Sequence, residues 1–241
     1  MMNCREAPRW KAHSRESQVT PAVYIVDDDV SVRESLELLI RHAGWRPISA
    51  GSAREFLSKP QDSAPSCLIL DIWLPDTSGL DLQLQLAERD HPPIIFLTGC
   101  GDVSTSVRAI KAGALDFLTK PFRADHLRDL VRGALALDCD RRARRIESEQ
   151  LRQCHASLTP REREVLALVV SGLLNKQAAA HLCISAITYQ IHRTNVMRKM
   201  AAGSLAELVR MADALEIAIP HIPRPQHPSV ALALRGFGRP A

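Results

Sequence analysis

Residues 67–71 read Cys-Leu-Ile-Leu-Asp, an unbroken apolar run that ends at a carboxylate. A run without polar alternation is typical of a strand buried on both faces, as in a parallel sheet covered by helices. Further strands are expected at 23–26, 48–50, 94–97 and 115–118. Amphipathic patterns predict helices at 31–42, 53–58, 80–88, 103–112 and 124–137. These strand–helix units predict an α/β domain with a five-stranded parallel sheet.

Composition narrows the class of protein. The chain has 241 residues and a hydrophobic fraction of 46%, which is ordinary for one or two globular domains. Its longest aliphatic runs are far too short to cross a bilayer, and residues 1–21 are polar with no secretory h-region. Its 6 cysteines lack Cys-x-x-Cys spacing, which favours reduced thiols over a disulfide framework or a zinc site. We therefore expect a cytoplasmic protein with no membrane partner.

The pattern changes after the predicted α/β domain, because no further strand is expected beyond residue 137. We expect a polar extension at 1–21, the α/β domain at 22–137, a charged and partly helical linker at 138–153, a helical domain at 154–217 and a proline-rich disordered tail at 218–241. Residues 22–137 carry an excess of acids, whereas 151–217 hold 8 Lys and Arg against 5 Asp and Glu. This basic excess is compatible with nucleic-acid binding, but an excess of this size is also a normal fluctuation.

Acidic side chains follow two of the predicted strands. Asp27 and Asp28 come directly after 23–26, and Asp71 comes directly after 67–70. Because the carboxyl ends of parallel strands meet at one edge of a sheet, we expect these carboxylates in one cleft. Clustered carboxylates repel one another, and hard oxygen ligands in this number suit Mg²⁺. Any one of these acids alone would more simply be the first residue of a loop.

Two other strand ends carry groups that suit a phosphoryl ligand. Thr98 follows 94–97, and Lys120 lies shortly after 115–118. A hydroxyl and an ammonium at this edge can contact the oxygens of a phosphoryl group on Asp71. Lys120 alone would more often be an ordinary salt-bridge partner, but the coincidence of five such residues at strand ends favours a phosphoacceptor site.

The second domain has the pattern of a helix-turn-helix at about 175–194. Thr159 and Glu162 form a possible capping box for a first helix. Helices are then expected at 175–183, 187–200 and 205–215. The predicted helix at 187–200 has an inward stripe formed by Tyr189, His192, Val196, Met197 and Met200.

A second stripe of the same helix is free to enter a major groove, and its residues are Gln190, Ile191, Thr194 and Arg198. Four further residues are candidates for phosphate contacts, namely Lys176, Thr188, Arg193 and Lys199. The pattern fits a small helical bundle with solvated charges about equally well, because short helical pairs are common in all-α domains.

Several motifs resemble a known family. Residues 26–29 (Val-Asp-Asp-Asp), 70–79 (Leu-Asp-Ile-Trp-Leu-Pro-Asp-Thr-Ser-Gly), 97–102 and 111–122 resemble the receiver domain of two-component response regulators. Residues 158–166, 172–179 and 192–200 resemble the LuxR-type helix-turn-helix. Residues 22–216 together resemble the FixJ/NarL class of response regulators, and FixJ-like members most of all.

The resemblance implies a flavodoxin-like receiver and a small all-α DNA-binding domain. It implies that a sensor histidine kinase phosphorylates Asp71. It assigns Mg²⁺ to Asp27, Asp28, Asp71 and the Trp73 carbonyl, the phosphoryl contact to Lys120, and the conformational switch to Thr98 and Phe117. It further implies a phosphorylation-dependent homodimer that binds promoter DNA and activates transcription with RNA polymerase. The only catalysis expected is autophosphatase activity of the receiver.

The sequence departs from the family in its recognition segment. Ala186-Ile187 stands where Pro-Arg is frequent, and Gln190 stands where FixJ-like members often have Glu. Gln reads adenine where Glu reads cytosine, so a different operator preference is expected.

Two other functions fit the sequence less well. A phosphatase of the haloacid dehalogenase kind needs a second Asp two residues after the nucleophile, where this chain has Trp73. The intact acceptor set argues against a scaffold with a relic site.

Overall fold

The computed structural model describes residues 20–60, 63–87, 90–99 and 103–218. The chain divides into two compact units, Met1–Glu147 and Ser148–Ala241. Each unit has its own buried hydrophobic residues. Almost all of the predicted N-terminal extension (1–21) and of the predicted tail (218–241) lies outside the described residues.

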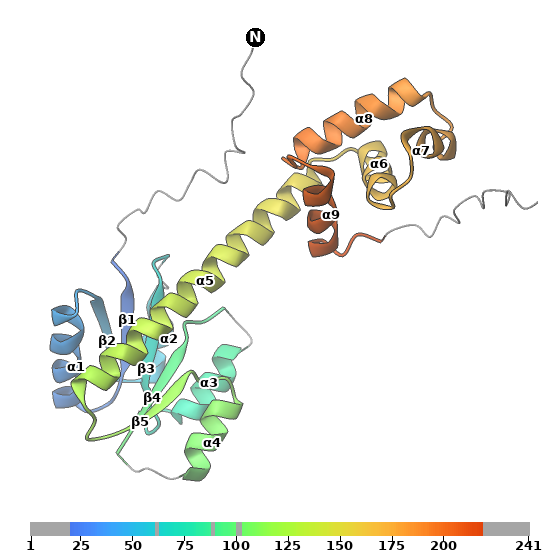
Figure 1. The fold of residues 1–241 in the computed structure, drawn as a ribbon. Helices are drawn as coiled ribbons and strands as arrows, with labels where there is room; N and C mark the ends of the chain where they lie inside the picture. Colours follow the sequence, from blue (N-terminus) through green and yellow to red (C-terminus); the bar gives the residue numbers. More distant parts are fainter. Residues whose placement is uncertain (1–19, 61–62, 88–89, 100–102, 219–241) are drawn as a thin grey trace, which may run out of the picture. The chain divides into compact units, whose positions relative to one another are not determined.

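Five strands of the first unit form one parallel sheet in the order β2-β1-β3-β4-β5 (Figure 1). They are β1 (Ala22–Val26), β2 (Arg46–Ala50), β3 (Ser66–Asp71), β4 (Ile94–Thr98) and β5 (Asp116–Thr119). This confirms the predicted flavodoxin-like sheet. β2 lies next to β1 on one side and β3 lies next to it on the other, so the order of the strands reverses at β1. Such a switch point opens a crevice at the carboxyl ends of the two strands.

Helices cover both faces of the sheet (Figure 1). They are α1 (Val30–His42), α2 (Ala53–Ser58), α3 (Gly79–Ala87), α4 (Val103–Lys111) and α5 (Ala124–Ala156). Successive residues of a strand point to opposite faces. Val23 and Ile25 therefore pack with α1 and α5, while Tyr24 and Val26 pack on the α2–α4 side. Both faces need apolar side chains, which explains the unbroken apolar runs in the sequence.

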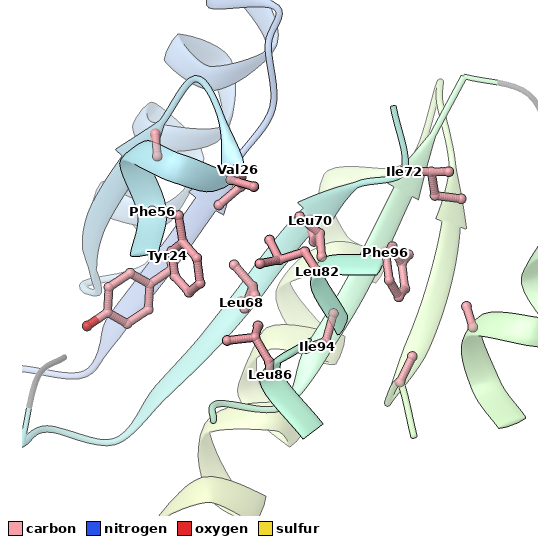
Figure 2. Close-up of a cluster of buried hydrophobic side chains, with 14 of the residues drawn as sticks. Tyr24, Val26, Phe56, Leu68, Leu70, Ile72, Leu82, Leu86, Ile94 and Phe96 are labelled. Carbon is pink, nitrogen blue, oxygen red and sulfur yellow. The ribbon is translucent and has the colours of Figure 1, made fainter. Parts of the chain in front are cut away.

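Figure 2 shows the hydrophobic cluster on the α2–α4 side of the sheet. The rings of Tyr24 and Phe56 meet edge to face, with centroids 5.6 Å apart. Leu68, Leu70 and Phe96 extend the cluster across β3 and β4. This packing fixes the central strands, and with them the residues at their carboxyl ends.

Two central strands are longer than the sequence predicts. β3 includes Asp71 and β4 includes Thr98, because the ladder pairs Asp71 with Leu97 and Thr98 with Thr119. Both polar residues were expected just after their strands. Their backbones are instead held inside the sheet, which gives their side chains a defined direction.

The predicted charged linker (138–153) lies within a helix. α5 continues from Ala124 to Ala156 without a break, whereas the sequence predicts its end at residue 137 and a linker that is helical only in part. Residues 134–156 contain no Gly or Pro and are rich in strong helix formers, which explains the continuation. Buried Asp138 further anchors the helix, since its carboxylate accepts hydrogen bonds from the Ser66 amide at 2.7 Å and the Arg142 Nε at 2.6 Å.

The second unit is helical, as predicted. Its helices are α6 (Pro160–Val170), α7 (Asn175–His181), α8 (Ala186–Lys199) and α9 (Leu205–Ala214). The predicted capping box is present, because Thr159 and Glu162 exchange hydrogen bonds between side chain and backbone. Ser185 caps α8 by accepting a hydrogen bond from the Thr188 amide at 3.0 Å. Leu182–Ser185 separates α7 from α8 and completes a helix-turn-helix.

No helix among the described residues combines the length and apolar character that crossing a membrane requires.

Candidate phosphoacceptor site and nucleic-acid interface

The three predicted acids come together at the carboxyl edge of the sheet. Oxygen atoms of Asp27, Asp28 and Asp71 all lie within 4.8 Å of one another. Asp27 and Asp71 are buried, at 1% and 6% exposure, while Asp28 is exposed to solvent. The cluster therefore has two buried carboxylates and a third that is accessible to solvent.

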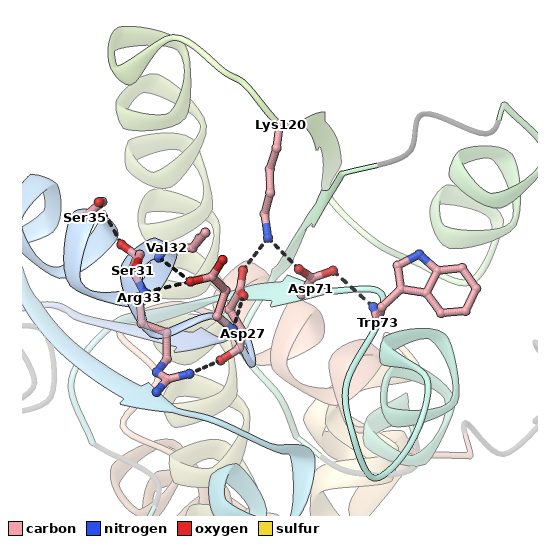
Figure 3. A network of polar contacts seen from close by, with 9 residues as sticks. Asp27, Ser31, Val32, Arg33, Ser35, Asp71, Trp73 and Lys120 are labelled. Atoms are coloured by element: carbon pink, nitrogen blue, oxygen red, sulfur yellow. Dashed lines mark hydrogen bonds and ion pairs between the residues drawn. The ribbon is translucent and has the colours of Figure 1, made fainter.

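Lys120 points toward this cluster from the loop after β5 (Figure 3). Its Nζ lies 2.6 Å from Asp27 Oδ2 and 2.6 Å from Asp71 Oδ2. The ammonium is thus the bridge between two buried carboxylates that would otherwise repel each other. The prediction that Lys120 belongs to the acidic cluster agrees with this geometry.

Burial and ion pairing act against each other in this cluster. Burial raises the pKa of Asp27 above its ordinary value, although the hydrogen bond from Lys120 opposes this change. Burial also disfavours the charged form of Lys120, but its hydrogen bonds to Asp27 and Asp71 outweigh burial and raise the Lys120 pKa. Lys120 is therefore charged at neutral pH, in direct contact with the carboxylates of Asp27 and Asp71.

The donor set fits a magnesium ion. The three carboxylates are hard oxygen ligands, and Mg²⁺ typically binds through one or two carboxylates together with waters and phosphate oxygens. Asp28 is exposed and is therefore accessible to such waters. Trp73, whose carbonyl is the fourth predicted ligand, donates its amide to Asp71 Oδ1 at 3.1 Å, so the loop that carries this carbonyl is tied to the Asp71 side chain.

Thr98 and Phe117 lie on the two neighbouring strands β4 and β5. Thr98 is fully buried, and its carbonyl accepts the Lys120 amide at 2.7 Å, which links it to the lysine of the cluster. Phe117 is half-buried, is paired with Phe96 in the sheet ladder and packs against the α2–α4 side. The backbones of Thr98 and Lys120 are therefore hydrogen-bonded directly, and Phe117 lies two residues before Thr119, the partner of Thr98 in the ladder.

Two positioning features of the acceptor site are absent from the sequence predictions. A Cβ on Gly79 would lie 2.2 Å from the Asp71 carbonyl oxygen, so only glycine fits at the start of α3. Arg33 of α1 donates from Nη1 to the Asp27 carbonyl oxygen at 2.6 Å and holds the β1–α1 turn. Gly79 stands in a quoted motif and could have been singled out, but nothing in the local pattern links Arg33 to Asp27.

The predicted recognition stripe is on the surface of the second unit. Gln190, Ile191, Thr194 and Arg198 are all exposed, and Ile191 is 58% exposed. The opposite stripe is buried or half-buried, with Tyr189 and Val196 fully inside. α8 therefore presents one polar face with an apolar residue in it, which is the arrangement that a major-groove helix needs.

The four predicted phosphate contacts fall into two kinds. Lys176 is exposed, and within the residues that the structure describes its ammonium pairs with no other group. Arg193 donates from Nη1 to Asn175 Oδ1 at 2.8 Å, and Thr188 shares a hydrogen bond with Ser185 at 2.8 Å. Lys199 donates from Nζ to Glu162 Oε2 at 2.6 Å and to the Ser157 carbonyl at 3.2 Å.

Lys199 is therefore held in an ion pair within the fold, which makes it a weaker candidate for a phosphate contact than Lys176. Glu162 is only 4% exposed and would be a buried charge without this partner. The pair joins α6 to α8. Arg193 retains donor groups beyond its bond to Asn175 and stays a candidate.

Comparison with known proteins decides the class of this chain. The response regulator receiver domain matches residues 23–132, and the LuxR family of bacterial regulatory proteins matches residues 156–212. The chain is a response regulator with a LuxR-type DNA-binding domain. Such a regulator is a transcription factor and not an enzyme, and its partners are a kinase and DNA. This confirms the resemblance and the predicted fold class.

Relatives of this response regulator match it over most of their length. Nodulation protein W of Bradyrhizobium diazoefficiens is 45% identical over 219 residues, which are 90% of this chain and 96% of that protein. Transcriptional regulatory protein FixJ of the same species is 37% identical over 79% of this chain and 93% of FixJ. The structure of response regulator StyR is similar with a TM-score of 0.75, at 44% identity, and covers 80% of this chain and 98% of that one.

The Glu162–Lys199 pair of the regulator allows a test of whether Lys199 stabilises the second unit or contacts DNA. We expect Lys199→Met to lower the stability of the second unit by about 1.5–3 kcal/mol, the range for a hydrogen bond to a charged group. The hydrogen bond from Lys199 holds the pKa of Glu162 at about 2, below its ordinary 4.5. The stabilisation of the folded state by this pair is therefore complete above pH 4.5 and is lost as the pH falls toward 2. Calorimetry of the full chain at pH 7, 4.5 and 3 measures this.

The salt dependence of DNA binding supplies the control. A phosphate contact contributes about 1 to the slope of log K against log salt concentration. Lys176→Met should reduce this slope without changing stability, whereas Lys199→Met should leave the slope unchanged. A reduced slope for Lys199→Met at full stability would return Lys199 to the DNA interface.

Proposed function

We propose that a sensor histidine kinase phosphorylates this regulator on Asp71, and that the phosphorylated protein dimerises, binds promoter DNA and activates transcription by RNA polymerase in the cytoplasm. The bridge of Lys120 between buried Asp27 and Asp71 carries the proposal. It places a permanent cation beside a carboxylate at an open strand end, which is where a phosphoryl group needs charge compensation.

The chemistry follows from the charges of the cluster. Asp27, Asp28, Asp71 and the Trp73 carbonyl would hold Mg²⁺, which neutralises the phosphoryl oxygens during transfer. An Asp71 carboxylate oxygen forms the bond to phosphorus while the bond to the histidine nitrogen of the donor breaks. Lys120 remains as the second positive charge beside the new group.

The added charge gives the protein a means to switch. The phosphoryl oxygens are strong acceptors, and the Thr98 hydroxyl is the donor on the adjacent strand. Movement of Thr98 toward Asp71 would vacate space for the half-buried Phe117 ring and alter the α4–β5–α5 face. We propose that this altered face is where two phosphorylated copies meet.

A mobility-shift assay with acetyl phosphate tests the function. The probe is promoter DNA recovered by selection from a random library with the phosphorylated protein. After treatment with acetyl phosphate and MgCl₂, we expect the protein to shift the DNA at lower concentration and to form a dimer in analytical ultracentrifugation. Equal affinity with and without acetyl phosphate, for a protein that carries the phosphoryl group on Asp71, would contradict the proposal.

Gln190 is proposed to read bases, while Lys176 is proposed to hold the DNA backbone. A well-formed bidentate contact is worth about 1–3 kcal/mol of discrimination between bases. Gln190→Ala should therefore reduce preference at one operator position, and Lys176→Ala should weaken binding to all sequences about equally. Parallel library selections with both variants measure the two effects. An unchanged preferred sequence for Gln190→Ala would remove Gln190 from the set of reading residues.

A further inference from the structure

The loop between β3 and α3 (residues 72–78) carries the Trp73 carbonyl, and its base is well held. The Trp73 amide donates to Asp71 Oδ1, and the Gly79 amide donates to the Ile72 carbonyl at 2.8 Å. Trp73 and Ser78 form an isolated antiparallel bridge across the loop. These contacts close the base of the loop but leave its tip to be fixed in some other way.

Asp76 near the tip of this loop makes contacts to a different helix. Its Oδ1 accepts the Ala53 amide at 3.1 Å and its Oδ2 accepts the Arg54 amide at 2.8 Å, so both oxygens bind the first turn of α2. α2 already has a local cap, because Ser52 Oγ accepts the Glu55 amide at 3.2 Å. Asp76 is therefore a second cap that comes from 22 to 23 residues away in sequence.

We propose that Asp76 is a positioning residue for the magnesium site, because it ties the loop that carries the Trp73 carbonyl to the start of α2. This inference rests on the proposed function of the acidic cluster. The backbone amides at a helix start are fixed donors, so a carboxylate bound to two of them has a defined place. Only two residues lie between Trp73 and Asp76, so motion of the loop tip would also move the Trp73 carbonyl.

The variants that test this are Asp76→Ala, Asp76→Asn and Ser52→Ala. Asp76→Ala removes both links to α2, and Asp76→Asn keeps an oxygen acceptor for one. Ser52→Ala is the matched control, since it removes a cap from the same helix and leaves the loop untouched. Mg²⁺ alone is titrated into unphosphorylated full-length protein, with Trp73 fluorescence as the signal after Trp10→Phe and Trp45→Phe changes. Trp73 is 68% exposed and adjacent to the cluster.

We expect Asp76→Ala to weaken Mg²⁺ binding by roughly tenfold, the lower end of what metal sites lose when groups that orient their ligands are removed. Asp76→Asn should lie between it and the wild type, and Ser52→Ala should bind Mg²⁺ normally. Phosphorylation by acetyl phosphate should need correspondingly more MgCl₂ in Asp76→Ala and reach the wild-type rate at saturation.

Two results would overturn the inference. Equal Mg²⁺ requirements for phosphorylation of Asp76→Ala and the wild type would show that the base of the loop suffices. An equal weakening in Ser52→Ala would assign the effect to the stability of α2. Failure of the proposed function gives a different result, since a wild-type protein that binds Mg²⁺ but never carries a phosphoryl group on Asp71 would contradict the phosphoacceptor role and leave the titration valid.

Discussion

Asp71→Asn is expected to take up no phosphoryl group from acetyl phosphate or from a kinase. An amide oxygen is a far weaker nucleophile than a carboxylate, and the variant also removes one charge from the proposed Mg²⁺ site. The fold should persist, because Asn can still accept a hydrogen bond from Lys120 and because repulsion between Asp71 and Asp27 is removed. Radiolabel from ³²P-acetyl phosphate, followed by calorimetry, measures both expectations.

Asp81→Asn is the matched control, since it makes the same chemical change at an exposed residue of the neighbouring helix α3. It should be labelled like the wild type. Label retained on Asp71→Asn would place the acceptor elsewhere. Equal promoter occupancy by Asp71→Asn and wild-type proteins under kinase-activating conditions would show that DNA binding does not depend on Asp71.

Gly79→Ala is expected to impair phosphorylation nearly as strongly as Asp71→Asn, although residue 79 bears no functional group. Its Cβ would lie 2.2 Å from the Asp71 carbonyl oxygen and 3.1 Å from Ile72 Cα, and both contacts are to backbone. Backbone cannot rotate away as a side chain can, so either β3 or α3 must shift. Such overpacking typically costs about 1–3 kcal/mol, and a displaced Asp71 loses its bonds to Lys120.

Gly133→Ala provides the comparison, because a Cβ there meets nothing within 4 Å and the residue lies in the middle of α5. Alanine at that site should raise stability by about 0.5–1 kcal/mol. We expect Gly79→Ala to melt earlier and to be phosphorylated at least tenfold more slowly than Gly133→Ala. A normal phosphorylation rate in Gly79→Ala would show that β3 and α3 separate without moving the acceptor.

The receiver site was largely predictable because strand ends are local features. An apolar run buried on both faces signals a parallel strand, and all such strands end at one edge, so Asp27, Asp71 and Lys120 could be placed together. Helix ends were predictable for a similar reason. Gly44 and Gly113, which have φ of 82° and 97°, follow α1 and α4 because only glycine takes this conformation without strain.

The helical domain was less predictable in its charges. Periodicity separates the buried face of α8 from its exposed face, as Tyr189 and Gln190 show. Periodicity does not reveal which of the lysine and arginine side chains on the exposed face has an ion-pair partner. Lys199 and Lys176 look alike in sequence, yet Lys199 pairs with Glu162, 37 residues away. That pairing depends on how α6 packs against α8.

The chain's pattern of apolar runs, caps and strand-end polar residues was enough to predict a parallel α/β domain, a helical second domain and the members of the acidic cluster. Strands, helices and their ends depend on residues that are close together in the sequence. The links from Asp76 to α2, from Arg33 to the Asp27 carbonyl and from Asp138 to Ser66 came only with the folded chain. Packing brings these groups within hydrogen-bonding distance across as many as 72 residues, and no local periodicity encodes such a distance.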